Sequence, residues 1–142
     1  MDTRVAQVEV IVYKIVENEP HFLLVKRIPE RGGFWQPITG GVNENEDLAS
    51  AAKRELLEET QISKYNNFLE DVYYFEFDSD GYGHLKEYVF GVEVDGETDV
   101  KLSYEHSEKK WCQLEEALQL LKYDTNKDAF KKLFEKLKAG TE

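Results

Sequence analysis

Two apolar segments near the start of the chain predict a β-hairpin. Residues 5–15 carry apolar side chains at nearly every second position, and several intervening residues near the centre are apolar too. This pattern is typical of a strand that is buried on both sides at its centre. A second apolar run at 22–25 follows a polar stretch at 17–20, so we expect two strands joined by a polar turn.

A glycine-containing stretch leads from this hairpin to the strongest predicted helix. Residues 29–33 are typical of a turn, and 34–41 run from it into the adjacent glycines Gly40 and Gly41, where the backbone can approach another group closely. Residues 47–60 are rich in Ala, Leu, Glu, Lys and Arg and contain no Gly or Pro. They begin with acidic residues, which suit the positive end of a helix dipole, so a helix is predicted here.

The second half of the chain predicts a further hairpin and a short strand. Residues 71–77 and 87–94 are rich in aromatic and β-branched side chains, with a glycine-containing turn at 80–83 between them. A short strand is expected at 109–112.

Two helices are expected to close the chain. The first is short and amphipathic, over 114–121, and the second starts near Thr125, which with Asp128 approximates a capping box. The order of elements is therefore strands, helix, strands and two helices. This order predicts an α+β fold in one domain over residues 1–142.

The charge balance limits the partners. With 18 Lys and Arg against 29 Asp and Glu, the formal net charge is −11. Such a charge repels phosphate backbones and anionic lipid headgroups, so nucleic acid and membrane surfaces are not expected as partners. If the substrate is an anion, a divalent cation held by carboxylates is the simplest device to attract it.

Cysteine content and hydropathy add two further expectations. Cys112 stands alone, so it forms no internal disulfide, and with three scattered histidines it makes no zinc pattern. The amino-terminal residues show no basic segment followed by a purely apolar one, and no apolar run is long enough to span a membrane. We therefore expect a soluble, cytoplasmic protein, and its oligomeric state stays open.

The helix predicted at 47–60 carries candidate metal ligands. Glu55, Glu58 and Glu59 are spaced i, i+3 and i+4, which gathers three carboxylates within about one-third of the helix circumference. A solvated acidic face would show the same pattern. Oxygen ligands at this density also suit Mg²⁺ or Mn²⁺, which leave coordination positions for water and substrate phosphates.

The surrounding spacing separates these two interpretations. From Gly40 the chain runs through five residues to Glu46 and through seven more to Arg54, which begins the segment Arg-Glu-Leu-Leu-Glu-Glu-Thr-Gln-Ile. This segment, residues 40–62, resembles the Nudix box, and the resemblance extends over nearly the whole chain. It implies an α/β/α sandwich around a mixed β-sheet, with the box forming a loop, a helix and a loop.

One position departs from the box. Gln61 stands where the box has glycine, at the end of the helix. A positive φ is usual there, and a residue other than glycine costs roughly 1 kcal/mol. Gln61 therefore bears on the shape of the local turn more than on the ligand chemistry, since all the carboxylates of the box remain.

The resemblance also implies the roles of the box residues. Glu55, Glu58 and Glu59 would bind Mg²⁺, or Mn²⁺ in its place, and a backbone carbonyl near Thr39 or Gly40 would complete the metal shell. Arg54 and Glu46 would brace the loop through an ion pair. Nudix enzymes often recruit a later acidic residue to the metal, and Glu105 is our candidate for that role. Which glutamate acts as the base stays open, because crowded carboxylates titrate as a set.

Segments outside the box are similar to those of dihydroneopterin triphosphate pyrophosphatases. The similarity rests on the stretch 34–41 and on 110–111 with 123–127. It implies a metal-dependent hydrolase that cleaves a triphosphate to a monophosphate and pyrophosphate. The candidate substrate-binding residues are Lys26, Arg27, Trp35, Thr39, Thr125 and Asn126.

Several alternatives stay open. A deoxynucleoside triphosphate such as dATP is a competing substrate, since adenine and pterin are both flat, hydrogen-bonding rings. A diadenosine polyphosphate or another nucleoside diphosphate linked to X is also possible, because the fold does not select X. A nucleotide-binding module without catalysis is a further alternative, against which the intact Glu55, Glu58 and Glu59 argue.

Overall fold

The computed structural model describes residues 6–81 and 83–139. Val5, with which we expected the first strand to begin, lies outside the described residues. The strands are β1 (Ala6–Val16), β2 (Glu19–Arg27), β3 (Trp35–Gln36), β4 (Ile38–Gly41), β5 (Asn67–Ser79), β6 (Gly83–Glu93) and β7 (His106–Cys112). The helices are the 3₁₀ turn Pro29–Arg31, α1 (Leu48–Thr60), α2 (Leu114–Leu120) and α3 (Asp124–Ala139).

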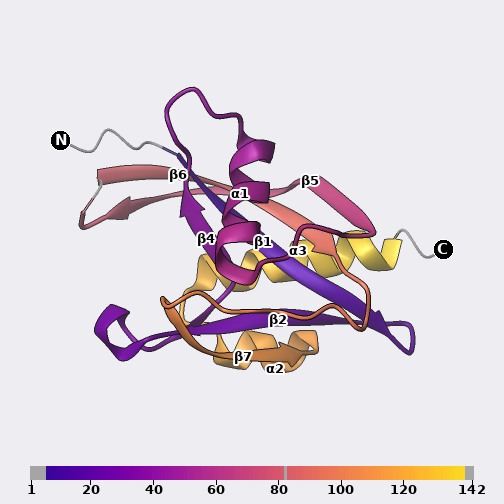
Figure 1. Cartoon of the computed structure of the whole chain (residues 1–142). Coiled ribbons are helices and arrows are strands. Elements are labelled where there is room, and N and C mark those ends of the chain that lie inside the picture. Colours follow the sequence, from indigo (N-terminus) through magenta and orange to yellow (C-terminus); the bar gives the residue numbers. More distant parts are fainter. Residues whose placement is uncertain (1–5, 82, 140–142) are drawn as a thin grey trace.

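All seven strands belong to one mixed sheet with β1 at its centre. β1 runs parallel to β6 and antiparallel to β2 and β4. β5 continues the sheet beyond β6, while β3 and β7 both pair with β2. Figure 1 shows these strands with α1 in front of the sheet. The α+β fold and the mixed sheet predicted from the sequence are confirmed.

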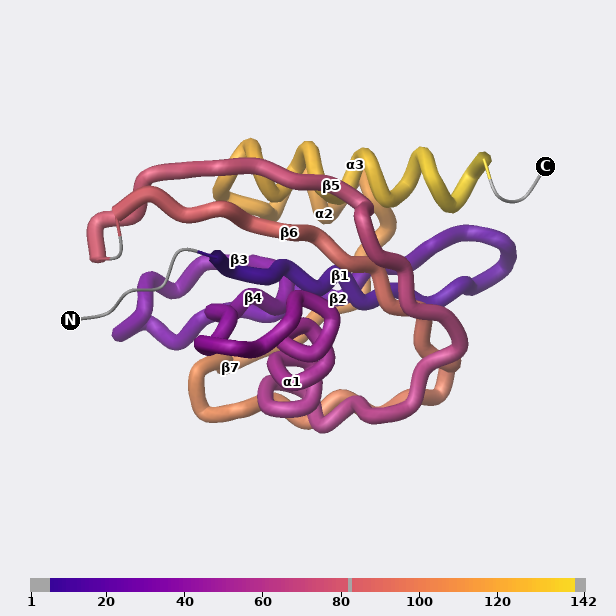
Figure 2. The backbone as a smooth tube through the Cα atoms, turned by 90° about the horizontal axis from the view of Figure 1, so that it is seen from above, coloured from indigo at the N-terminus to yellow at the C-terminus, as the bar shows by residue number. Residues whose placement is uncertain are grey.

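Helices cover both faces of the sheet. Figure 2 shows α1 on one side and α3 on the other. Along β1, Val8, Val10 and Val12 pack in the core beneath α1, whereas Ile11 and Tyr13 pack in the core shared with α2 and α3. The alternation seen in the sequence therefore separates two cores, because successive side chains of a strand point to opposite faces. None of the described helices is long and apolar enough to cross a membrane.

β1 and β2 separate along their length. They pair only between Tyr13 and Val16 on β1, and beyond that β1 pairs with β4 while β2 pairs with β3. Pro37 lies between β3 and β4, where the chain passes from the edge of β2 to the edge of β1. Proline donates no ladder hydrogen bond, so it suits this crossing point.

Four local expectations needed correction. The stretch 34–41, for which we predicted no strand, contains β3 and β4, and the pattern missed them because their pairing partners on β2 and β1 are distant in the sequence. β5 begins at Asn67, and a register shift between Leu69 and Tyr73 hides its alternation. α3 begins at Asp124, so Thr125 lies within its first turn and does not cap it. The first hairpin turns at Glu17 and Asn18, both with positive φ, which leaves Glu19 and Pro20 to β2.

Candidate active site

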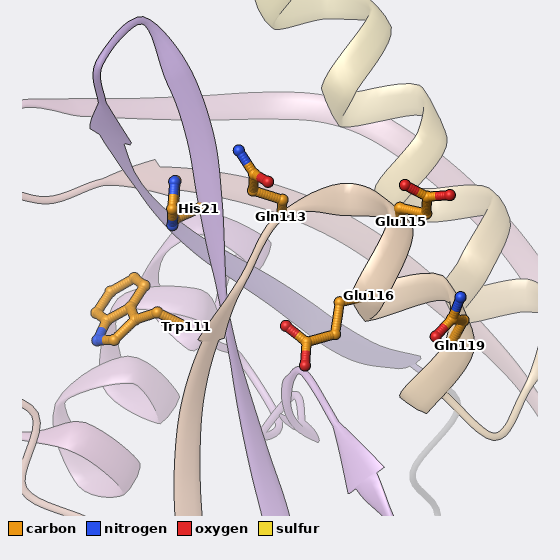
Figure 3. Close-up of a pocket in the computed structure, with 6 residues that line it drawn as sticks. All are labelled: His21, Trp111, Gln113, Glu115, Glu116 and Gln119. Atoms are coloured by element: carbon orange, nitrogen blue, oxygen red, sulfur yellow. The ribbon is translucent and has the colours of Figure 1, made fainter.

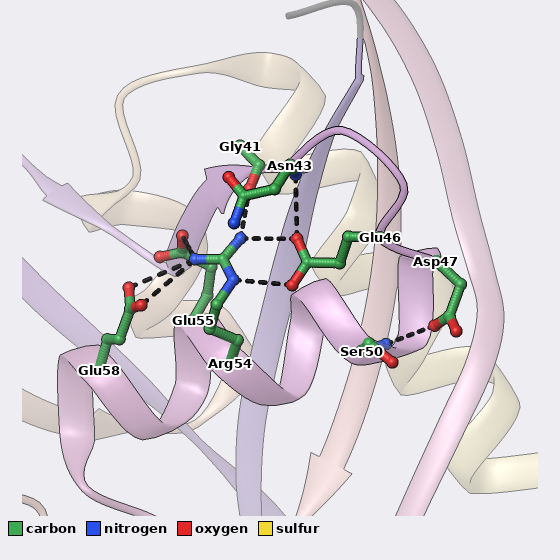
Figure 4. Close-up of polar contacts among 8 residues, drawn as sticks. All are labelled: Gly41, Asn43, Glu46, Asp47, Ser50, Arg54, Glu55 and Glu58. Atoms are coloured by element: carbon green, nitrogen blue, oxygen red, sulfur yellow. Dashed lines mark hydrogen bonds and ion pairs between the residues drawn. The ribbon is translucent and has the colours of Figure 1, made fainter.

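Side chains and backbone at both ends fix the position of α1. Asp47 caps its first turn, because its Oδ1 accepts a 2.7 Å hydrogen bond from the Ser50 amide (Figure 4). That bond from the Ser50 amide holds the pKa of Asp47 below its ordinary value. At the other end Gln61 has φ 61° and ψ 18°, and its amide donates to the carbonyl of Leu57. The helix therefore ends in the left-handed conformation expected at this box position, with glutamine in place of glycine.

Arg54 connects the loop before α1 to the acidic face of the helix (Figure 4). Its Nε lies 2.8 Å from Glu46 Oε2 and its Nη2 lies 3.0 Å from Glu46 Oε1, so the pair is bidentate. Nη2 also donates to the Gly41 carbonyl at 2.7 Å, and Nη1 donates to Glu55 Oε1 at 2.7 Å. Hydrogen bonds from Arg54 hold the pKa of Glu46 below its ordinary value. The bracing ion pair between Arg54 and Glu46 is thus present in the structure.

Glu55 lies against the glycine that opens the box. A Cβ built on Gly40 would overlap the carboxyl carbon of Glu55, so only glycine leaves room for that carboxylate. Glu55 is 9% exposed, and burial raises its pKa in spite of the hydrogen bond from Arg54. The neighbouring carboxylates Glu58 and Glu59 raise it further. A cation beside Glu55 would lower this cost of charge.

Glu59 meets a loop that follows β6. The amides of Lys101 and Ser103 donate to the carbonyls of Thr60 and Glu59, which ties this loop to the end of α1. The Ser103 hydroxyl donates to Glu59 Oε2 at 2.8 Å. His106 Nδ1 lies 3.0 Å from the same oxygen but is not aligned for a hydrogen bond. Burial works to raise the pKa of Glu59, but His106 and Ser103 outweigh it and keep that pKa below its ordinary value.

The same loop brings Glu105 beside Glu59. Burial, and then the Glu59 carboxylate, raise the pKa of Glu105. Glu105 Oε1 lies 3.2 Å from Nη1 of Arg31, and the Glu105 carbonyl accepts from the Ile28 amide. The acidic residue that we expected from a later loop therefore lies next to the box, between Glu59 and an arginine.

A cleft of about 980 Å³ lies near these glutamates, none of which belongs to its lining. It lies where β1 and β2 separate, and it is bounded by β1, β2, β3, β4, the β5–β6 hairpin and the start of α3. Its lining includes Gln7, Arg27, Arg31, Phe34, Gln36, Thr39, Phe75, Phe77, Glu87, Tyr123, Thr125 and Asn126. Two contacts connect the cleft to the glutamates: Arg31 reaches Glu105, and Gln36 Nε2 lies 3.2 Å from His106 Nε2.

The cleft collects most of the predicted substrate-binding residues. Arg27, Thr39, Thr125 and Asn126 line it, whereas Lys26 and Trp35 do not. Lys26 and Trp35 are cross-strand partners, and Lys26 Nζ lies 3.6 Å from Glu108. The Trp35 ring packs with the core under α2 and α3. Since successive residues of β3 face opposite ways, Gln36 takes the cleft side that we had expected for Trp35.

Sequence reasoning missed several residues around the cleft. Arg31 lies in the 3₁₀ turn, within the stretch 29–33 that we interpreted only as a turn. Gln36 and His106 belong to no sequence motif that would have indicated a role in the site. Glu9 and Glu87 did give a signal, because each is an acidic residue within a strand otherwise rich in apolar side chains. Both are nearly or completely buried, at 0% and 2% exposed.

A second cavity lies between β2, β7 and α2 (Figure 3). It has a volume of about 340 Å³, and its lining holds Glu115 and Glu116 but no arginine or lysine. It also includes no residue of α1. The larger cleft also has acidic lining residues, namely Asp78, Asp80, Glu87 and Asp124, but it adds Arg27 and Arg31. Of these two cavities, the larger cleft is therefore the one that offers cationic side chains to an anionic substrate.

The carboxylates do not form a closed metal site as the side chains lie. Across residues 6–81 and 83–139, no three His, Cys, Asp or Glu side chains converge as a set that could hold a metal ion. Arg54 Nη1 contacts both Glu55 and Glu58, at 2.7 and 3.4 Å, and so turns these carboxylates toward itself. The donor atoms are nevertheless all oxygens, which is the chemistry that Mg²⁺ prefers.

Comparison with known proteins finds a family match over most of the chain. Residues 5–134 match the model of the NUDIX domain. The chain is 36% identical over 126 residues to an octanoyltransferase of Myxococcus xanthus, which covers 88% of this chain. This chain spans only 35% of that longer protein. It is also 30% identical over 115 residues to the asymmetrical bis(5'-nucleosyl)-tetraphosphatase of Caenorhabditis elegans, covering 80% of this chain and 82% of that one.

Solved structures of two hydrolases are similar to this chain over most of its length. A crystal structure of a C. elegans Ap4A hydrolase binary complex superposes with a TM-score of 0.83 at 28% identity, over 96% of this chain and 98% of that one. The Escherichia coli dihydroneopterin triphosphate pyrophosphohydrolase superposes with a TM-score of 0.77 at 25% identity, over 91% and 94%.

Proposed function

Because the chain belongs to the NUDIX domain family and is a hydrolase of phosphoric anhydride bonds, we propose that its substrate carries a flat heterocyclic ring and a chain of phosphates. The ring would occupy the cleft between the β5–β6 hairpin and the start of α3. The phosphates would extend past Arg27 and Arg31 toward Glu55, Glu58, Glu59 and Glu105.

The observation that carries this proposal is a buried N–H group of Arg27 that lacks a hydrogen-bond partner among the described residues. The Arg27 guanidinium lines the cleft, and the group without a partner is its Nε. A buried donor without a partner costs free energy, and a cationic one is best satisfied by an anion. A phosphate oxygen would provide that partner, since guanidinium groups match phosphate geometry.

The acidic residues offer carboxylate oxygens, which are the ligands that a divalent cation such as Mg²⁺ prefers. Nudix hydrolases generally use divalent metals such as Mg²⁺. Here Glu55, Glu58, Glu59 and Glu105 would hold Mg²⁺, or Mn²⁺, with the carbonyl of Gly40 as a further oxygen, once Glu55 and Glu58 turn from Arg54. Their crowding, which raises the pKa of the buried Glu55 and of Glu105, would be relieved by a cation. When bound, the cation supplies charge neutralisation at the leaving phosphate and a lower pKa for the attacking water.

The residues of the chain then have separate tasks in hydrolysis. The oxygen of a water molecule forms a bond to phosphorus while the bridging P–O bond breaks, and the leaving phosphate takes the electron pair. A carboxylate of the glutamate set accepts the proton of the water. The hydrogen bond from Ser103 orients Glu59, and Ser103 and the nearby His106 hold the pKa of Glu59 below its ordinary value, so it is available for this step. Arg27 and Arg31 would hold the phosphates in place.

Two substrate classes fit the proposal. A pterin or purine triphosphate would give a monophosphate and pyrophosphate, as we expected from the sequence, and the similarity to the E. coli dihydroneopterin triphosphate pyrophosphohydrolase supports it. A dinucleoside tetraphosphate would give a mononucleotide and a nucleoside triphosphate. The match to the C. elegans tetraphosphatase over most of both chains supports this second class equally.

Product analysis distinguishes these classes. The full-length protein would be incubated with dihydroneopterin triphosphate, dATP, diadenosine tetraphosphate or ADP-ribose, with millimolar Mg²⁺ or with a chelator. We expect turnover of at least one triphosphate or tetraphosphate and its loss with chelator. Pyrophosphate as product supports the first class, and a nucleoside triphosphate supports the second. Turnover that is insensitive to chelator, or no turnover of any of these compounds, would overturn the proposal.

A matched pair of variants links turnover to the glutamates. Glu58→Gln changes an exposed carboxylate of the acidic face, so it should fold normally and lose activity. Glu70→Gln makes the same change at an exposed position on β5 and should keep wild-type activity.

A further inference from the structure

Two buried carboxyl groups lie at the wall of the cleft. Glu9 on β1 and Glu87 on β6 are 0% and 2% exposed, and Glu87 lines the cleft. They lie on the α3 side of the sheet, opposite the face that holds Glu55, because Glu9 alternates with Val8 and Val10 of the α1 core. The proposed chemistry of phosphate hydrolysis does not use either of them.

Two amide side chains are oriented by this acidic pair. Gln7 Nε2 donates to Glu87 Oε1 at 2.6 Å, and Asn126 Nδ2 donates to Glu9 Oε1 at 2.7 Å. Both Gln7 and Asn126 line the cleft. Because their nitrogens face the carboxyl groups, their carbonyl oxygens are the atoms left for a ligand.

The second oxygen of Glu9 indicates where a proton resides. Glu9 Oε2 has no hydrogen-bond partner among the described residues, although it is completely buried. Burial, and then the neighbouring Glu87, raise the pKa of Glu9 well above its ordinary value. Burial also raises the pKa of Glu87, against the hydrogen bonds from Glu9 and Gln7, so the two carboxyl groups titrate as a pair. With the first proton of the pair on the more deeply buried Glu9, Glu9 can donate to Glu87, and Glu87 faces the cleft as an acceptor.

We propose that Glu87, Gln7 and Asn126 form a subsite that binds the N–H edge of a 2-amino-4-oxopyrimidine ring, the ring that guanine and pterins share. This inference rests on the proposed function for the presence of a ring in the cleft. The subsite presents acceptor oxygens, and that edge presents a ring N–H beside an amino group. Adenine presents a ring nitrogen acceptor beside its amino group, so one acceptor of the subsite would face another and remain unpaired.

The neighbouring aromatic residues suit the same ligand. Phe75 and Phe77 on β5 line the cleft, as does Tyr123 before α3. Flat rings pack well against such side chains whatever their hydrogen-bonding edge. The aromatic residues would therefore contribute affinity, and the oxygens of the subsite would select the ring.

The test compares rings with the wild-type protein first. kcat/KM would be measured for dihydroneopterin triphosphate, GTP and ATP, and binding of neopterin, GMP and AMP would be measured by calorimetry. We expect the 2-amino-4-oxo compounds to exceed the adenine compounds about tenfold or more in both measurements, since a site that pairs N–H groups rejects rings lacking them. A higher value for dihydroneopterin triphosphate would identify the pterin as the source of the edge, and a higher value for GTP would identify guanine.

Variants connect that preference to the subsite. Glu87→Gln replaces an acceptor by a mixed donor and acceptor of equal size, so the preference over ATP should fall about tenfold, mainly through KM. Gln7→Met changes a less buried residue of the same subsite and should also reduce the preference for GTP over ATP. This second variant keeps the test valid if Glu87→Gln does not fold. The exposed Glu70→Gln on β5 is the matched control and should retain the preference.

The outcomes separate this inference from the proposed function. Hydrolysis of ATP and GTP with equal kcat/KM would overturn the subsite while the hydrolase stands. Equal binding of AMP and GMP would also overturn it, whether or not any triphosphate is hydrolysed. Absence of all turnover together with selective binding of GMP or neopterin would support the subsite and overturn the proposed hydrolysis.

Discussion

Gly40 and Glu55 are in direct contact, and the space that the missing side chain leaves is filled by the carboxylate of Glu55. Gly40 lies on β4, whereas Glu55 lies in the middle of α1, so this contact joins the strand to the helix. Gly40 does not have a positive φ, and the requirement for glycine there is therefore one of space.

Gly40→Ala should consequently inactivate the enzyme without unfolding it. The added methyl group would displace the Glu55 carboxylate, and a displacement on the order of 1 Å at a reacting centre can cost about 10²-fold in rate. The measurement is kcat with a hydrolysed substrate, together with thermal unfolding. Gly96→Ala is the control, because a Cβ at Gly96 meets nothing within 4 Å, and it should behave as wild type. An active Gly40→Ala would show that Glu55 tolerates displacement.

Glu59→Gln should lower kcat by roughly 10²-fold or more while the protein keeps its fold. The amide keeps the size of the side chain and can still meet Ser103 and His106, but it cannot carry the negative charge. Steady-state kinetics and circular dichroism would measure the two effects. A variant with wild-type kcat would remove Glu59 from the proposed cation site.

Gln61→Gly should stabilise the protein. Gln61 has φ 61°, a conformation that glycine adopts without a Cβ penalty. The penalty is roughly 1 kcal/mol, of which the greater freedom of glycine in the unfolded chain offsets a part. We expect the free energy of unfolding to rise by about 0.5 kcal/mol, measured by urea titration, with activity unchanged. Gln61→Val, which adds a β-branched residue at positive φ, should destabilise the protein, and the reverse order would contradict the proposed strain.

The stability of the protein should depend on Glu9 as the pH rises. Burial raises the pKa of Glu9 well above the ordinary value of 4.5. The folded state therefore keeps a proton that the unfolded chain releases, so the contribution of Glu9 is fully present below pH 4.5 and is lost as the pH rises through the folded-state pKa. Urea unfolding of wild type and Glu9→Gln from pH 5 to 8 would measure this. We expect wild type to lose stability relative to the variant over that range, and a constant difference would exclude this linkage.

The sequence predicted the elements whose signals are local. Residues 47–60 have helical composition, and the helix begins and ends within one residue of that range. The gathering of Glu55, Glu58 and Glu59 on one helix face follows from their spacing, because it depends on helix geometry alone. The ion pair between Arg54 and Glu46 was implied by the resemblance of residues 40–62 to the Nudix box, and the two side chains are in contact in the structure.

The cleft could not be predicted in the same way. Gln36, Arg31 and Glu87 reach it from β3, a 3₁₀ turn and β6, and only the pairing of distant strands brings them together. The prediction for Trp35 shows the limit most clearly. Neighbouring residues of a strand point to opposite faces of the sheet, so an error of one residue selects the wrong face. We expected Trp35 to line the cleft, and its neighbour Gln36 does so instead.

Successive side chains of β1 point to opposite faces of the sheet, so one strand supports both the acidic residues and the wall of the cleft. Val8 and its neighbours support α1 and the carboxylates beside Gly40. On the other side of β1, Gln7 lines the cleft, and the buried Glu9 accepts a hydrogen bond from Asn126, which lines the cleft too. A substitution on one face need not disturb the other. Divergent evolution of this chain could therefore change which ring is accepted through single substitutions at Gln7, Glu87 or Asn126, while descendants inherit the bond-breaking apparatus intact.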